Sequence, residues 1–169
     1  MENFIEPYHV QFVHKTTTNQ PLADHYLVED EHCLGSAVDL TSEQQNKGKE
    51  GTLSVSSRYL TLFPNFVLGV YYPDQLGVHL NQPISAGSTH QRRVIYQLKS
   101  ADQSADEIDK IRKLWISVHK EDHEICERLQ QGRHSDLSEQ GGLLSPHWES
   151  SVRKFQELVA DSIRPAFKH

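Results

Sequence analysis

The chain has 169 residues, 36% of them hydrophobic, and its 17 basic residues are outnumbered by 23 acidic ones, so that its net charge is −6. This length suits a single domain over residues 1–169. The sequence contains no run of about 18 apolar residues, as a membrane-spanning helix needs, no basic stripe for nucleic acid and no basic, apolar leader. These features predict a soluble cytoplasmic protein that binds neither membrane nor nucleic acid.

The first part of the chain reads as a helix, a loop and then strands. Residues 2–14 predict a short helix with an irregular end, and Pro7 lies in its first turns, where proline is tolerated. Residues 15–23 have loop composition, 25–40 predict one or two strands, and 41–52, rich in Ser, Gln, Asn, Lys and Gly, predict a mobile surface loop. Strand patterns follow over 53–63, 66–72, 77–84 and 90–99, with turns at 74–77 and 85–88.

Two helices close the chain. The first spans about 104–131 and ends near Gly132, and the second spans about 146–164, with Ser145 as its N-cap and Pro146 at its first position. A run of strands flanked by long helices predicts an α+β fold, in which an antiparallel sheet grips a helix.

His9 and His14 are candidate metal ligands. Two histidines five residues apart are a weak signal among 11, because chance alone gives about 0.7 such pairs. On a continuous helix this spacing rotates a side chain by about 140°. Both histidines can therefore reach one metal only if the helix ends or bulges between them.

Asp122 interrupts an apolar stripe on the first long helix. The stripe has helical spacing and comprises Ile111, Trp115, Val118, Ile125 and Leu129. A carboxylate on such a face is costly unless it is paired or bound to metal. Three interpretations stay open: a metal ligand, a salt bridge to Arg or Lys, or a different helix register. Two histidines and one carboxylate would form the facial triad of non-haem Fe(II) oxygenases.

Four motifs resemble the large (alpha) subunits of Rieske-type, aromatic-ring-hydroxylating non-haem iron oxygenases, in their C-terminal catalytic domain. E-N-F-I-E-P-Y-H-V-Q-F-V-H at 2–14 is similar to the family's iron-binding signature. L-F-P-N at 62–65, the segment 121–132, and 144–149 with Phe155 resemble three further motifs in the same order. The resemblance covers nearly the whole chain and implies a helix-grip fold like that of START domains.

The resemblance also implies roles for individual residues. It implies that His9, His14 and Asp122 bind a mononuclear Fe(II). Glu6 matches an acid that bridges to a Rieske histidine of the neighbouring subunit, and its alternative is a surface acid in a first helical turn.

Further positions match residues around the iron. Asn3 matches an asparagine near the iron, and Phe4 and Val10 match positions in the substrate pocket. Tyr8 either supports the metal ligands or is a core aromatic residue.

The activity implied by the resemblance is O2-dependent hydroxylation of a small organic substrate, aromatic or related. Electrons would come from a two-iron two-sulfur Rieske cluster and a reductase, within a homotrimer. The Rieske domain and one sheet strand would precede residue 1, and Cys33 and Cys126 cannot supply the cluster's two Cys and His pairs. We therefore expect no activity without those partners. The alternatives are a truncated, non-catalytic helix-grip module that binds a ligand, or an inert subunit.

The remaining candidates have simpler interpretations. His119 and His123 could share a metal, but their charged neighbours favour a solvated helix face. Arg92-Arg93 predicts the outward side of a strand, and both cysteines predict small buried thiols. Polar surface is expected for His32, His79, His90, His134 and His147. No pocket residue selects between aromatic acids and quaternary amines as substrates.

Overall fold

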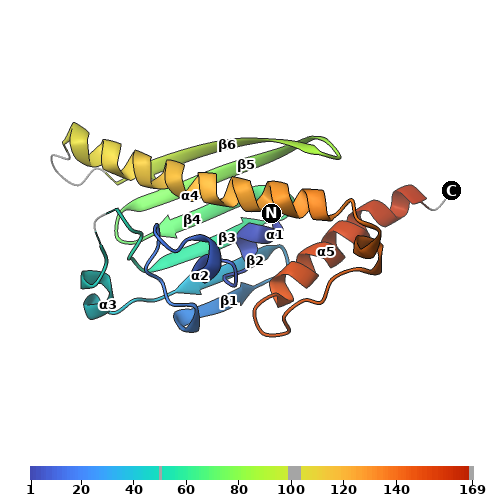
Figure 1. Ribbon diagram of the computed structural model, residues 1–169, viewed down its shortest axis with the longest axis horizontal. Coiled ribbons are helices and arrows are strands. Elements are labelled where there is room, and N and C mark those ends of the chain that lie inside the picture. The colour runs from blue at the N-terminus through green and yellow to red at the C-terminus, as the bar shows by residue number, and fades with distance from the viewer. Residues whose placement is uncertain (50, 99–103, 168–169) are drawn as a thin grey trace.

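The computed structural model describes residues 1–49, 51–98 and 104–167 (Figure 1). Six antiparallel strands follow one another in chain order across a single sheet. They are β1 (His25–Glu29), β2 (Cys33–Val38), β3 (Ser57–Leu62), β4 (Phe66–Tyr71), β5 (Gln75–Ser85) and β6 (Ser88–Gln97). Neighbours in the chain are therefore neighbours in the sheet, as in a meander.

The helices α1, α2, α4 and α5 lie on one face of this sheet (Figure 1). They comprise α1 (Glu2–Ile5), α2 (Val10–Val13), α4 (Ala105–Gly132) and α5 (Ser150–Ile163). Helix α4 crosses the face, α2 packs against it, and α1 lies between β2, β3 and α5. Short helices fill the connections: η1 (Leu22–Asp24), α3 (Ser42–Asn46), η2 (Asp136–Gln140) and η3 (Arg164–Phe167). The predicted α+β fold, an antiparallel sheet gripping a long helix, is confirmed.

Two hydrophobic clusters hold the helices to the sheet. One joins α1 to α5 through Ile5, Leu34, Val152 and Phe155. The other joins α4 to the sheet and comprises Leu53, Tyr71 and Trp115, with Val55, Tyr59, Ile95, Ile111, Leu114 and Val118 around them. The apolar stripe predicted on the long helix thus faces the sheet, although Leu129 at its end is exposed.

Two glycines make room for Tyr71 in the second cluster. Gly69 and Gly77 are cross-strand partners on β4 and β5. A Cβ at Gly69 would lie 2.3 Å from the Tyr71 hydroxyl, and one at Gly77 would lie 3.2 Å from its ring. The Tyr71 ring therefore lies over bare backbone, with its centroid 4.3 Å from that of Trp115 on α4.

Several predicted boundaries are wrong. Residues 42–46, expected in a mobile loop, form α3, because Thr41 and Gln44 make a capping box. The last helix begins at Ser150 and not at Pro146, which lies in a turn where Ser145 accepts a hydrogen bond from the Trp148 N–H. Strand β3 begins only at Ser57 and β5 already at Gln75, so the turn before β5 lies at 72–74. Glu50 and Lys99, in two of the predicted segments, lie outside the described residues.

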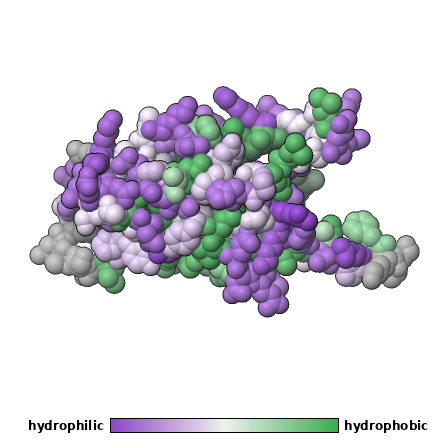
Figure 2. Space-filling model, turned by 90° about the horizontal axis from the view of Figure 1, so that it is seen from below, coloured by the Kyte–Doolittle hydropathy of each residue, from purple (hydrophilic) through white to green (hydrophobic). Residues whose placement is uncertain are grey.

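Hydrophilic residues dominate the surface seen from below the view of Figure 1, with smaller hydrophobic areas among them (Figure 2). Within the described ranges, no helix combines the length and the apolar composition needed to cross a bilayer.

Candidate metal centre

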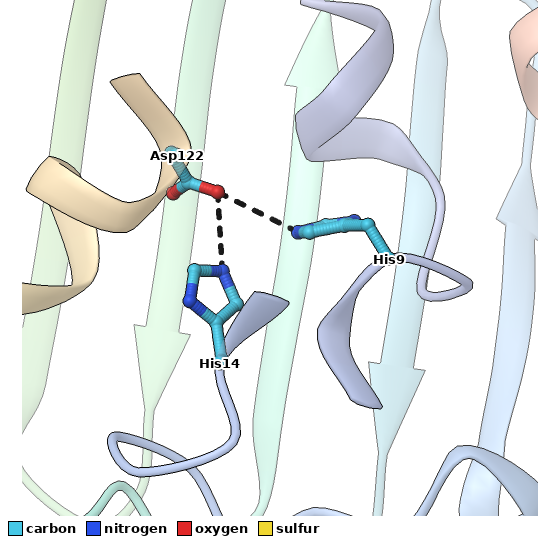
Figure 3. A group of neighbouring side chains, drawn as sticks. All are labelled: His9, His14 and Asp122. Atoms are coloured by element: carbon cyan, nitrogen blue, oxygen red, sulfur yellow. Dashed lines mark ion pairs between the residues drawn. The ribbon is translucent and has the colours of Figure 1, made fainter. Parts of the chain in front are cut away.

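The structure brings His9, His14 and Asp122 together at one point between α2 and α4 (Figure 3). His9 is the N-cap of α2, and His14 is its C-cap, where the backbone leaves the helical conformation at φ −93° and ψ 40°. The helix is thus a single turn that ends between the two histidines, as the spacing required. Both imidazoles point toward Asp122 on α4.

The separations of the three side chains fit a common metal ion. The Nε2 atoms of His14 and His9 lie 3.1 Å and 3.7 Å from Oδ1 of Asp122, and one donor atom of each residue lies within 4.8 Å of the others. Two ligands bound at about 2.1 Å and at right angles on one ion are about 3.0 Å apart. Two imidazoles and one carboxylate are also a donor set that suits Fe(II).

A second carboxylate stands behind each imidazole. Oε1 of Glu6 lies 2.6 Å from Nδ1 of His9, and Oε2 of Glu121 lies 2.8 Å from Nδ1 of His14. Each carboxylate can accept a hydrogen bond from Nδ1–H, which would leave Nε2 free for a metal, as is usual for metal-binding histidines. Glu6 is buried, with 8% of its surface exposed, so the alternative of a surface acid is wrong.

Glu121 is a functional candidate that the sequence did not reveal. It precedes Asp122 on α4 and is one of the charged neighbours of His119 and His123 that predict a solvated helix face. Its carboxylate instead accepts hydrogen bonds from Oγ1 of Thr17 at 2.6 Å and from Nδ1 of His14. The sequence signal available for it was its position beside the one acid on the apolar stripe.

Asp122 is held by neutral or titratable partners. Asn3 donates from Nδ2 to its Oδ1 at 2.9 Å, and its ion-pair partners are His9 and His14. In the part of the chain that the structure describes, no Arg or Lys pairs with it. The Arg or Lys salt bridge left open by the sequence is therefore excluded within those residues.

The charges of the centre shift the pKa of two of its groups. Burial alone would raise the pKa of the Asp122 carboxyl, but the hydrogen bond and charge of His14 outweigh it and lower that pKa. Burial likewise disfavours the His14 imidazolium, yet the nearby Asp122 and Glu121 carboxylates raise its pKa above the ordinary value. The pocket thus stabilises positive charge at the point where a cation would bind.

A cavity of about 60 Å³ adjoins the three side chains. Asn3, Phe4, Glu6 and Val10, all singled out from the sequence, line it together with the triad. Tyr8 does not, because it is 42% exposed and packs edge-on against Phe12, so it is not a core aromatic residue either. The other lining residues are Thr18, Ser36, Leu53, Tyr59, Tyr71, His79, Arg93, Trp115 and Val118.

The predictions for His79 and Arg93 are wrong. His79 is buried, with 6% of its surface exposed, and the Arg93 guanidinium lies 4.7 Å above the Trp115 ring. Both residues occupy the face of β5 and β6 that α4 covers, so the polar side of these strands points inward. Burial lowers the pKa of His79 to about 3, which keeps its imidazole neutral.

The other predicted surface positions agree with the structure in most cases. Arg92 and His123 are exposed, whereas His119 is half-buried. Cys33 is half-buried and Cys126 is exposed, so the expectation of a buried thiol fails for Cys126. Exposed histidines, as expected, are His32, His90, His134 and His147.

Comparisons with known proteins agree with this architecture. Residues 1–164 match the family described as the ring hydroxylating alpha subunit, catalytic domain. The solved structure of the quaternary ammonium Rieske monooxygenase CntA, bound to an inhibitor, is similar to 95% of this chain with a TM-score of 0.73 and 16% identity. The chain corresponds to 44% of that monooxygenase's length. No curated protein sequence matches it. The family match over residues 1–164 makes this chain a member of the ring-hydroxylating alpha subunit family, within its catalytic domain.

Proposed function

We propose that this chain is the catalytic domain of an oxygenase that hydroxylates a small organic substrate with O2 at a mononuclear Fe(II) held by His9, His14 and Asp122. The observation that carries the proposal is the convergence of two Nε2 atoms on one carboxylate oxygen, with each Nδ1 held by a second acid. A helix-grip module that only binds an apolar ligand has no need of this donor set, so the geometry favours the enzyme.

The protein's own residues would prepare the iron site. When bound, Fe(II) would supply open coordination positions and the redox chemistry that activates dioxygen. Glu6 and Glu121 would favour the imidazole tautomers that present Nε2 to the ion, and Asn3 orients Asp122. These contacts fix the ligand geometry before the ion arrives, which reduces the cost of binding it.

The cavity would position the substrate beside the iron. Phe4 and Val10 form part of its wall next to the histidines, and the buried Tyr71 and Trp115 close it on the sheet and helix sides. An apolar enclosure of this kind excludes water and holds the substrate in a narrow range of orientations.

Electron supply completes the proposal. We place the source in a Rieske cluster and a reductase outside this sequence, with Glu6 as the residue through which a neighbouring subunit of a homotrimer would connect to His9. The contact of Glu6 with Nδ1 of His9 supports this role.

The test is the iron content of the purified chain. After loading with Fe(II) without oxygen and desalting, the wild-type chain should retain close to one iron per chain. Asp122→Ala should release most of it, because only two imidazoles remain. Glu124→Ala, an exposed acid two residues further along α4, is the matched control and should retain its iron. Retention of iron by Asp122→Ala would show that the triad assignment is wrong.

A further inference from the structure

Arg93 places a positive charge on the wall of the cavity. Its Nε atom is buried without a hydrogen-bond partner, and its guanidinium contacts the neutral Tyr71 hydroxyl. Across residues 1–49, 51–98 and 104–167, no carboxylate forms an ion pair with it. The Asp122 carboxylate is near enough to stabilise the Arg93 charge. The Oδ1 atom of Asp122, however, already contacts Asn3, His9 and His14. A buried guanidinium remains charged, so its pairing is incomplete in the free protein.

His79 stands directly beside Arg93. The two residues are cross-strand partners on β5 and β6, so their side chains project from the same face of the sheet into the same cavity. The Nε2 atom of His79 is also buried without a hydrogen-bond partner. A neutral imidazole can donate one hydrogen bond, and a guanidinium can donate several in a planar fork. Two adjacent donors with unused capacity match the two oxygens of a carboxylate.

The aromatic part of the same wall argues against a cationic ligand. Arg93 lies 4.7 Å above the face of Trp115, which is the position that a quaternary ammonium would take in a cation–π contact. Tyr71 also packs against Trp115, with 4.3 Å between the ring centroids. A ligand cation would thus meet a like charge in a poorly solvated site, which is unfavourable.

We propose that Arg93 and His79 form an anion subsite in the cavity, and that the substrate is a small acid whose carboxylate pairs with Arg93 while its apolar or aromatic part lies toward Phe4 and Val10. This inference rests on the proposed function, because it takes the cavity as the substrate site. It narrows the substrate to acids, where the sequence left acids and quaternary amines equally open.

The experiment compares three probes of similar size: benzoate, its neutral analogue benzamide, and benzyltrimethylammonium. Their dissociation constants are measured by ligand-observed NMR titration of the purified full chain, as isolated and again with excess EDTA, so that no carboxylate can bind through a metal. At low salt, benzoate should bind about tenfold more tightly than benzamide, since a charge-assisted pair is stronger than a neutral hydrogen bond. Benzyltrimethylammonium should bind most weakly.

Two substitutions and one control locate the effect. Arg93→Met should remove the preference for benzoate while leaving benzamide binding within about twofold, and Arg93→Lys, which keeps the charge but loses the planar fork, should retain part of it. Arg92→Met, at the exposed neighbouring position, should leave all three constants unchanged. Circular dichroism verifies that each variant is folded, and the wild-type comparison alone decides the matter if Arg93→Met does not fold.

The outcomes separate this inference from the proposed function. Benzoate binding that is no tighter than benzamide binding, including no measurable binding of either, overturns the anion subsite, as does a preference that survives in Arg93→Met. A chain that retains iron through Asp122 but shows no benzoate preference contradicts the subsite alone. A chain that prefers benzoate but retains no iron contradicts the oxygenase proposal.

Discussion

Glu6 and His9 are joined by two hydrogen bonds. Oε2 of Glu6 accepts the backbone N–H of His9 at 3.0 Å, and Oε1 lies 2.6 Å from the Nδ1 atom of its ring. The first contact fixes the start of α2, and the second fixes the rotation of the imidazole. One buried carboxylate therefore determines both the position and the orientation of a candidate metal ligand.

Glu6→Gln should separate electron transfer from metal binding. Glutamine keeps one oxygen acceptor for His9 but loses the negative charge, so iron occupancy should stay nearly intact while turnover of an enzyme reconstituted with its electron donors slows. Glu6→Ala removes both contacts, and its iron affinity should fall about 10- to 100-fold. Iron content and turnover are measured for both variants, with Glu31→Ala at an exposed site as the control. Loss of iron from Glu6→Gln with unchanged electron transfer would refute the assignment.

Asp122→Ala should cost little stability in the metal-free chain. The ion-pair partners of Asp122 are histidines, and among the described residues no Arg or Lys forms an ion pair with it, although Arg93 would lose a nearby negative charge. An orphaned buried cation would instead cost about 3–5 kcal/mol. The measurement is the urea midpoint of metal-free Asp122→Ala against metal-free wild type. A loss in the larger range would indicate a structural salt bridge that the described contacts do not contain.

The isolated chain should not turn over with O2, a reduced nicotinamide and a reductase. The described cysteines, Cys33 and Cys126, are both free and are far apart in the sequence, which leaves no evident entry for electrons from a reductase. Addition of a separate Rieske protein should be required for product formation. Sustained hydroxylation by the chain and reductase alone, measured by product analysis, would contradict this.

Gly69→Ala should disturb the Tyr71–Trp115 contact. The new methyl group would lie 2.3 Å from the Tyr71 hydroxyl oxygen, so the ring must leave its present position against Trp115. Overpacking of this kind costs about 1–3 kcal/mol. Chemical denaturation measures the free energy of unfolding, and near-ultraviolet circular dichroism reports the aromatic contact. Gly87→Ala, where a Cβ meets no atom within 4 Å, should change neither, and equal effects of both substitutions would rule out the proposed role of Gly69.

His25 should make the protein less stable below neutral pH. It is buried, both ring nitrogens lack partners, and burial lowers its pKa to about 4. The unfolded chain, with a histidine pKa of about 6.5, binds more protons between these values, so stability is lost as the pH falls through this window. From pH 7 to pH 5 the loss attributable to His25 is about 2 kcal/mol.

His25→Phe keeps an aromatic ring beside Tyr59, whose centroid lies 6.3 Å from that of His25, and removes the titration. Urea unfolding at pH 7 and pH 5 should show a smaller pH dependence in this variant, whereas His134→Gln, at an exposed position, should match the wild type. An unchanged pH dependence in His25→Phe would mean that His25 is protonated at little cost in the folded protein.

The helical stripe and the triad could be predicted because each depends on local spacing or on a motif. The stripe that contains Trp115 and Asp122 identified α4 and the face that it turns to the sheet, since helical periodicity survives whatever the helix packs against. The end of α2 at His14 agrees with the geometry that one shared metal requires.

The orientation of His79 and Arg93 could not be predicted in the same way. A strand shows opposite faces at successive residues, and a displacement of one residue exchanges them. In β5 and β6 the face turned toward α4 carries the buried His79 and Asn81 and the half-buried Arg93, so hydrophobicity does not indicate which side is inside. The contact of Glu121 with His14 likewise depends on how α4 docks, because 107 residues separate the two in the sequence.

Every strand of the sheet lies between His14 and Asp122 in the chain. The ends of that span can meet only after the six-stranded meander has formed and α4 has docked across it. An ion would therefore bind there only after the whole sheet and α4 have assembled. Its binding free energy would stabilise the complete fold and not any single hairpin. Chelation should loosen the first 14 residues before the strands, because such an ion would join the segment that carries His9 and His14 to α4.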